Sequence, residues 1–299
     1  MSILVAGGNG RLGRAVLAQL GQNGRAAVRH RGTAGAIFID SDGNVDPADL
    51  AGVTAIVNCV NLVHGTTADI NRANVAYPRV LARAAREAGV QRFVQVSSFS
   101  IYGRAERIDA ATPLAPESDY GRSKLVAESE LAALATPNFS VVALRLPFMF
   151  SLEEPALMGR LVPLIQKLHF VPVRAGIPVQ RSMITYAGAA EALLCALHSD
   201  SQDGAGTVVA ADPRPLELGD IGQALRARGH RVATLPVPKF AIVAARRVVP
   251  GIVDRLFRSN ILAHDINMMR DGTAYPVTAE LAAYIEEWNR GRAGHAEES

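Results

Sequence analysis

Tyr120 and Lys124 are separated by one helical turn, so a helix over the segment 119–124 would place both side chains on one face. A tyrosine with an ordinary pKa of about 10 is a poor base at neutral pH. An ammonium group one turn away favours the phenolate and would move the pKa of Tyr120 toward the working range. The spacing therefore predicts a tyrosine that transfers protons.

A run of apolar residues over 92–97 reads as a strand and ends in the hydroxyl side chains of Ser97 and Ser98. In doubly wound sheets the ligand binds at the carboxyl edge of the strands, where Ser98 would lie. A serine at that point can donate a hydrogen bond to a substrate oxygen beside Tyr120. Serines also cap turns, but the order of the three features favours chemistry. We therefore predict Ser98, Tyr120 and Lys124 as the catalytic residues.

Glycines at positions 7, 10 and 13 follow the first expected strand and open a helix. In that context Gly7 permits the sharp turn out of the strand, and Gly10 lets the backbone approach a pyrophosphate. Gly13 lets the helix and the strand pack closely, while the helix N-terminus offers N–H groups and a positive dipole to phosphates. The turn predicts a dinucleotide site, in preference to a glycine loop without a ligand.

The end of the second expected strand is basic, with Arg29, His30 and Arg31 in succession. A site for NAD usually has an acidic residue there, whereas basic residues suit the 2′-phosphate of NADP. We therefore expect NADP (NADPH), with NAD as the alternative cofactor and solvated arginines as the alternative explanation. Arg11 would add positive charge to the turn, and Asp40 is placed to meet the adenine edge.

These residues need a parallel sheet to bring them together, and the N-terminal half has the pattern of one. Short apolar runs alternate with helical patterns, which predicts βαβ units. We expect strands over 2–6, 26–29, 36–39, 55–60, 92–97 and 140–146, and helices over 11–20, 71–88 and 120–134. The predicted fold class is α/β, a Rossmann-type doubly wound parallel sheet with a smaller C-terminal substrate-binding lobe.

After Pro147 prolines become denser and the alternation is less regular. We expect a dinucleotide-binding Rossmann domain over residues 1–150, with returning segments around 180–212, and mainly a substrate-binding lobe over 151–299. The segment 239–258 mixes apolar and basic residues, which suits either a membrane surface or a helix packed on the lobe. We favour packing.

Composition excludes several other classes of protein. The chain has no long uncharged apolar run, so we expect no membrane span and no membrane partner. A net charge of +3 is too weak to indicate nucleic acid. The histidines are scattered, which predicts no metal site, and the cysteines are too few for a disulfide framework. No basic leader precedes the strand beginning at Ser2, so we expect a cytoplasmic protein.

Together these motifs resemble the extended short-chain dehydrogenase/reductases, the NAD-dependent epimerase/dehydratase family. The resemblance rests on the glycine turn, the segment from Ser98 to Gly103, the Tyr120–Lys124 pair and Arg145-Leu146-Pro147. It implies that Ser98 polarises the substrate oxygen, Tyr120 passes the proton, and Lys124 tunes Tyr120 and holds the nicotinamide ribose. The residues expected at the cofactor are Gly7, Asn9, Gly10, Arg11, Leu12, Gly13, Arg29, Asp40, Lys124 and Pro147.

The resemblance also bears on the substrate. It implies a small molecule, a nucleotide sugar, with Ser98, Phe148 and Arg258 as substrate-binding residues; Arg255 is an alternative to Arg258. Sugar-nucleotide members commonly have asparagine where this chain has Phe148, which leaves the substrate class open. Asn74 matches the asparagine of the long central helix, although a surface polar residue would give the same pattern. A homodimer packed through that helix follows by analogy.

Three functions are compatible with these residues. The first is an NADPH-dependent reductase of a 4-keto nucleotide sugar or a related carbonyl compound. The second is a nucleotide-sugar epimerase that retains NAD tightly and acts through a transient ketone. The third is a non-catalytic protein that senses NADP, which the presence of both Tyr120 and Lys124 disfavours. We favour the first, an oxidoreductase.

Overall fold

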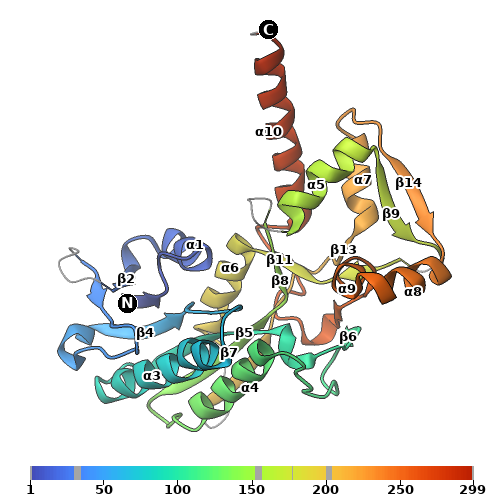
Figure 1. The fold of residues 1–299 in the computed structure, drawn as a ribbon. Helices are drawn as coiled ribbons and strands as arrows, with labels where there is room; N and C mark the ends of the chain where they lie inside the picture. Colours follow the sequence, from blue (N-terminus) through green and yellow to red (C-terminus); the bar gives the residue numbers. More distant parts are fainter. Residues whose placement is uncertain (1, 30–34, 152–156, 177, 200–203, 298–299) are drawn as a thin grey trace.

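A seven-stranded parallel sheet forms the centre of the computed structural model, which describes residues 2–29, 35–151, 157–176, 178–199 and 204–297. The strand order is β12-β7-β5-β4-β1-β2-β3 (Figure 1). The strands are β1 (Ser2–Ala6), β2 (Gly24–Val28), β3 (Ile37–Phe38), β4 (Val53–Asn58), β5 (Arg92–Ser98), β7 (Ser140–Leu146) and β12 (Ala205–Val209). All neighbouring strands run parallel, which confirms the predicted Rossmann-type α/β fold.

Helices cover both faces of this sheet, which explains why its strands are apolar runs and not alternating patterns. In β1, Ile3 and Val5 join the core beneath α1 (Arg11–Leu20) and α6 (Tyr186–Ala196). Leu4 and Ala6 point the other way, into the core beneath α3 (Tyr77–Glu87) and α4 (Asp119–Ala132). Successive side chains of one strand therefore hold two helical layers in place.

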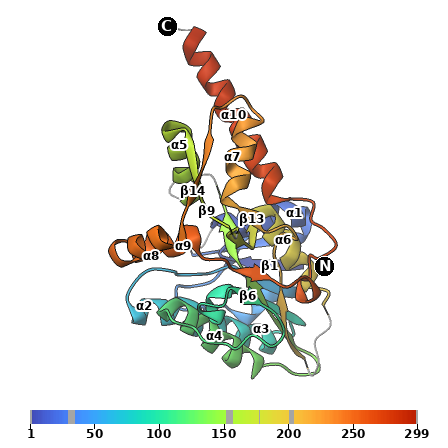
Figure 2. The ribbon, with the colours of Figure 1, turned by 90° about the vertical axis from the view of Figure 1, so that its right-hand side faces the viewer.

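A second group of elements has its own core, separate from the two layers around the sheet (Figures 1 and 2). It comprises α5 (Leu157–Leu168), β9 (Phe170–Arg174), α7 (Leu218–Arg226), β14 (Ala233–Val237) and α10 (Val277–Glu297). We call these elements the lobe. Sequence patterns missed α5, which has Pro163 inside it.

Short paired strands connect the lobe with the sheet. β8 (Phe148–Phe150) pairs with β11 (Met183–Thr185), and β6 (Arg107–Ile108) pairs with β15 (Ile261–Leu262). β10 (Gln180–Arg181) pairs with β13 (Leu216–Glu217). Each joins segments far apart in the chain, so no local pattern could reveal them.

The helix expected over 71–88 is interrupted. α2 (Thr67–Asn71) leads into a π-helical turn over Arg72–Ala76, which is followed by α3. The extra residue of a π turn displaces the ladder of helical hydrogen bonds, and such turns occur frequently at functional sites. Asn74 lies in this turn and is fully buried.

The segment 239–258 forms α8 (Lys239–Val248) and α9 (Pro250–Phe257). α9 buries Val253, but none of the residues of α8 is buried. Phe240 and Val248 are 77% and 80% exposed. The expectation that this whole segment packs on the lobe is therefore wrong for α8. Among the described residues, no helix is long and apolar enough to cross a membrane.

We expect Gly13→Ala to destabilise the chain by about 2 kcal/mol. A Cβ at position 13 would lie 2.2 Å from the carbonyl oxygen of Gly7, so the turn or α1 must move. Urea unfolding of both proteins measures the difference. Gly219→Ala in α7 is the matched control, because nothing lies within 4 Å of its added Cβ. Equal unfolding midpoints for the two variants would contradict the packing described.

Candidate active site

The candidate site lies at the carboxyl edge of the sheet. β1, β4 and β5 are neighbours and end at Ala6, Asn58 and Ser98. β1 leads into α1 on one face of the sheet, whereas the chain after β4 leads into α3 on the other face. These connections diverge between β1 and β4, the position at which doubly wound sheets bind their ligands.

The glycine turn fits a dinucleotide phosphate. Gly7 has a φ of +78°, and the N–H of Gly10 donates to its carbonyl oxygen at 2.9 Å. A Cβ on Gly7 would lie 3.0 Å from the backbone of Cys59, so the turn rests directly on the end of β4. Asn9 and Gly10 are exposed at the N-terminus of α1. The outer side of the turn is thus backbone that a pyrophosphate can approach.

Two other residues predicted at the cofactor have structural partners. Leu12 is buried in the core beneath α1, so only its backbone can face a ligand. The guanidinium of Arg11 donates to Ser151 Oγ at 3.2 Å and so ties the turn to the end of β8. Arg11 therefore connects the cofactor turn with the segment that leaves the sheet for the lobe.

Arg29 and Asp40 follow β2 and β3, which are neighbouring strands. Both act on Tyr77, whose pKa is raised to about 12 by burial and by the Asp40 carboxylate, with Arg29 opposing. The Asp40 carboxylate accepts hydrogen bonds from the side-chain amide and the backbone N–H of Asn44. These bonds hold the pKa of Asp40 below its usual value. Its carboxylate thus shapes its own turn, and its expected contact with adenine stays a prediction. Arg29 is exposed, while His30 and Arg31 lie outside the described residues.

Lys124 is buried in α4 with 1% of its surface exposed. Its ammonium donates to the carbonyl oxygen of Val96 at 3.1 Å and lies 5.7 Å from the ring centre of Tyr120. Burial lowers the pKa of Lys124 to about 8, and the neighbouring Cys59 and Glu128 oppose this shift. Cys59 also lies against Gly7, so the Lys124 ammonium and the glycine turn are both neighbours of the residue that follows β4.

Tyr120 is hydrogen-bonded to the side chains of Ser98 and Asn61. Burial raises the pKa of Tyr120, although both hydrogen bonds act to lower it. The net lowering of this pKa that we expected from Lys124 is therefore not found, because loss of solvent around the phenol dominates and the ammonium donates to Val96. The three predicted catalytic residues do come together. Asn61 was missed, although it stands three residues after the end of β4.

Ser98 has two roles. Its Oγ accepts a hydrogen bond from the backbone N–H of Ser100 at 3.1 Å and so caps the helical turn Phe99–Tyr102. The same oxygen bonds the Ser100 hydroxyl at 3.0 Å and Tyr120. The capping role weighed from the sequence is thus observed, and the cap holds the side chain in a fixed orientation, while the chemical role of Ser98 stays a prediction.

Asn74 fixes the loop that carries Asn61. Its side chain accepts from the N–H of Leu62 and donates to the carbonyl of Leu62, both at 2.8 Å. It also donates to Ser123 Oγ at 3.0 Å, and Ser123 in turn donates to the carbonyl of Tyr120. Asn74 is therefore a buried structural link between the end of β4 and α4, not a surface residue.

Glu128 and Arg145 form a buried ion pair below Lys124. The Arg145 guanidinium donates to both oxygens of Glu128, at 2.6 Å for the shortest contact, and to Tyr102 Oη at 2.9 Å. Burial opposes the charge of Arg145, yet Glu128 and Tyr102 raise its pKa. Glu128 was missed by sequence reasoning. Its position one helical turn after Lys124 was the available signal.

The remaining residues, Pro147 predicted at the cofactor and Phe148 and Arg258 predicted at the substrate, are more dispersed. Pro147 is buried at the end of β7, and Phe148 opens β8 with 47% of its surface exposed. Arg258 lies between α9 and β15, where its carbonyl accepts from Arg181 and its Nε is buried without a hydrogen-bond partner in the described structure. The binding roles of all three stay predictions, and nothing is described of the Arg255 side chain.

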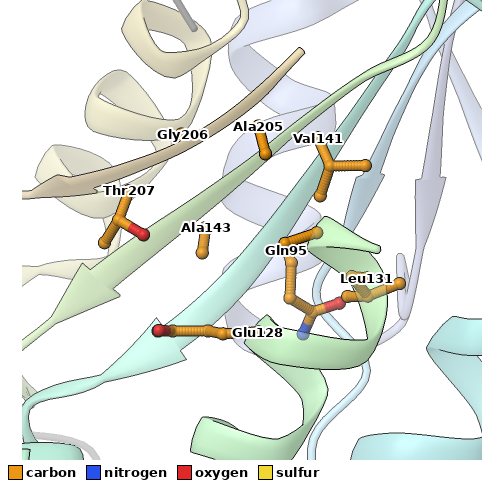
Figure 3. Close-up of a pocket in the computed structure, with 9 residues that line it drawn as sticks. Gln95, Glu128, Leu131, Val141, Ala143, Ala205, Gly206 and Thr207 are labelled. Carbon is orange, nitrogen blue, oxygen red and sulfur yellow. The ribbon is translucent and has the colours of Figure 1, made fainter. Parts of the chain in front are cut away.

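A cavity of about 220 Å³ beside α4 is not part of this site (Figure 3). Gln95 and Glu128 line it, together with residues of β7 and β12. Their polar groups are already engaged, because Gln95 bonds Asn58 and Val96 while Glu128 holds Arg145. In the described part of the chain, moreover, histidine, cysteine and acidic side chains form no cluster able to hold a metal ion.

The fold, the glycine turn and the Ser98–Tyr120–Lys124 arrangement define a nucleotide-binding α/β protein of the short-chain dehydrogenase/reductase type. The model of the NAD dependent epimerase/dehydratase family matches residues 3–210, more than half of the chain. The chain belongs to this family.

Two relatives of the chain have different activities. The chain is 28% identical over 195 residues to a 4-hydroxy-2-methyl-3-oxo-4-farnesyl-3,4-dihydroquinoline-1-oxide ketoreductase from Stigmatella aurantiaca, covering 59% of this chain and 58% of that protein. It is also 28% identical over 205 residues to a UDP-glucose 4-epimerase from Vibrio cholerae, covering 62% and 60%. The match thus spans less than two thirds of each relative's length.

Solved structures share the fold over the whole chain. A short-chain dehydrogenase/reductase superfamily protein from Agrobacterium tumefaciens, with bound NAD, aligns with a TM-score of 0.72. The alignment covers 100% of both chains at 20% sequence identity, a similarity that concerns the fold alone.

We expect the buried ammonium of Lys124 to lose its proton near pH 8, against 10.5 for an ordinary lysine. The remaining lysines, Lys167 and Lys239, are exposed, so their replacement by arginine leaves one lysine signal for side-chain NMR. Between these pH values the unfolded chain binds the proton and the folded chain does not. The contribution of Lys124 to the unfolding free energy therefore rises with pH across that window. A titration near 10.5 would contradict its burial.

Proposed function

We propose that the chain is an NADPH-dependent reductase of a carbonyl compound, with Tyr120 as its proton donor. The observation that carries the proposal is the phenol of Tyr120, which is bonded to Ser98 and lies over the ammonium of Lys124. Because burial raises the pKa of Tyr120, the phenol keeps its proton at neutral pH. A protonated phenol beside a hydroxyl suits reduction, in which the carbonyl oxygen must receive a proton.

In carbonyl reduction, Ser98, Tyr120 and Lys124 would each have a separate role. The hydroxyl of Ser98 donates a hydrogen bond to the substrate carbonyl oxygen, which polarises the carbonyl and orients it toward Tyr120. Tyr120 Oη then gives its proton to that oxygen. Lys124 stabilises the phenolate that remains, since its ammonium is held close to the ring. A bound nicotinamide cofactor supplies the hydride for the carbonyl carbon.

Several features support a cofactor at the carboxyl edge of β1 and β4, with NADPH as its form. The pyrophosphate would lie on Gly10 and the N-terminus of α1, and the buried ammonium of Lys124 would meet the nicotinamide ribose. Arg29 is exposed at the end of β2, where it would pair with a 2′-phosphate. The Agrobacterium structure contains NAD, so the preference for NADPH rests on Arg29.

For the substrate we propose a 4-keto nucleotide sugar or a related carbonyl compound, bound between the sheet and the lobe. The match to a ketoreductase supports carbonyl reduction, and the match to an enzyme of UDP-glucose supports a nucleotide sugar. Phe148 presents an exposed aromatic ring next to Pro147. Arg258, between α9 and β15, would meet a phosphate through its guanidinium.

A nucleotide-sugar epimerase is the second candidate, supported by the match to UDP-glucose 4-epimerase. An epimerase uses the same residues but regenerates its cofactor within each turnover, so it retains NAD. Release of stoichiometric NAD when the purified protein is denatured would therefore favour the epimerase. It would contradict a reductase that exchanges NADPH with solution.

We expect Tyr120→Phe to lower kcat for carbonyl reduction by about 100-fold or more, because the variant lacks the proton donor. NADPH affinity should change little, which fluorescence titration checks separately. Tyr275→Phe is the matched control, since this tyrosine is exposed and outside the site. Reduction at the wild-type rate by the Tyr120 variant would show that another group supplies the proton.

We expect Arg29→Asp to weaken NADPH binding about tenfold or more while NADH binding holds or improves. The change removes a charge-assisted hydrogen bond and adds a carboxylate that repels a 2′-phosphate but accepts from a ribose hydroxyl. Dissociation constants for both cofactors provide the measurement. An unchanged ratio between them would remove the argument for NADPH.

A further inference from the structure

We infer that α8 and the strand before it form a docking surface for an anionic phospholipid membrane. Their exposed apolar side chains define what we call the α8 surface: Leu235, Phe240, Val243, Val248 and Val249. No residue of α8 is buried, although seven of its ten residues are apolar. This surface is independent of the proposed reaction, and neither the family nor the relatives described assign it a role.

The apolar residues of α8 follow the spacing of one helical face. Phe240, Val243, Ala244 and Val248 stand at positions i, i+3, i+4 and i+8, which form a stripe. In a protein whose surface faces only water, such a stripe packs on a core. Here it is exposed, with Phe240 at 77% and Val248 at 80%. A stripe of this kind lies readily in the interface of a bilayer.

The opposite side of α8 already has a partner. Arg246 pairs with Asp254 of α9 at 2.7 Å, which ties the two helices together. Ala241 and Ile242 are partly covered. The pairing with α9 orients the stripe outward, and in both views α8 stands at the outer margin of the molecule (Figures 1 and 2).

The positive charge around α8 indicates which kind of partner surface it would bind. Residues 231–258 contain six basic residues and one acidic residue, a formal charge of +5, while the whole chain carries +3. The remaining residues therefore sum to −2. Lys239 and Arg247 are exposed; Arg247 lies within the stripe and Lys239 borders it one turn before Val243, so their stems can lie along apolar surface while the charges reach outward. An apolar stripe with local positive charge is complementary to anionic headgroups.

The α8 surface is attached to the segment that leaves the candidate site. β15 follows α9 and pairs with β6, which comes shortly after Ser98 and the turn Phe99–Tyr102. A membrane bound at α8 would thus be connected to the carboxyl edge of the sheet through α9, β15 and β6.

Flotation of the full chain with lipid vesicles tests the inference. We expect binding to vesicles of equal parts phosphatidylcholine and phosphatidylglycerol, and much weaker binding to phosphatidylcholine alone or at high salt. Lys239→Gln with Arg247→Gln should weaken binding about 25-fold, at roughly fivefold per charge. Phe240→Ser with Val248→Ser should weaken it about tenfold or more.

Leu114→Ser with Val126→Ser is the matched control, because both residues are exposed and lie outside the α8 surface. Circular dichroism shows that each variant is folded. Absence of vesicle binding, or equal binding by the α8 and control variants, overturns the inference. So does a wild-type dimer that becomes monomeric only in the Phe240 variant, because α8 would then be an interface between copies of the chain.

Discussion

The buried ammonium of Lys124 is the constraint on which the rest of the site depends. A charged group in a protein interior is costly unless polar partners compensate for the lost water. Here the carbonyl of Val96 accepts from it directly, and the Glu128 carboxylate lies one helical turn away. Since Val96 belongs to β5 and Glu128 to α4, the charge can be accommodated only if helix and strand keep this register. That register also fixes Tyr120 beside Ser98.

The surrounding hydrogen bonds protect the same register. Asn74 links the loop after β4 to Ser123 of α4, and the π-helical turn brings its side chain to this point. On the other side, Gly7 rests on Cys59, which adjoins Lys124. The proposed cofactor turn and the proposed proton donor are thus parts of one packed unit. By contrast, α8 is outside this unit, and its exposed face calls for a different explanation.

The sequence predicted most of what depends on local pattern. β1 and β7 have the expected bounds because apolar runs between polar or glycine-rich segments identify buried strands, and one-turn spacing placed Tyr120 and Lys124 together. What failed depends on distant residues. The pairing of Arg107 with Ile261 has no local signature. Helix α5 was not predicted because Pro163, a residue unfavourable inside helices, lies within it. The raised pKa of Tyr120 arises from burial, which spacing does not reveal.

The central claim is that the glycine turn and the Ser98–Tyr120–Lys124 group are two ends of one cofactor site. A crystal structure of the chain with NADPH tests it most directly. We expect the pyrophosphate at the N-terminus of α1, over Gly10, and the nicotinamide ring beside Tyr120, with Lys124 at its ribose. A cofactor whose nicotinamide lies away from Tyr120, or whose pyrophosphate avoids the turn, would contradict it.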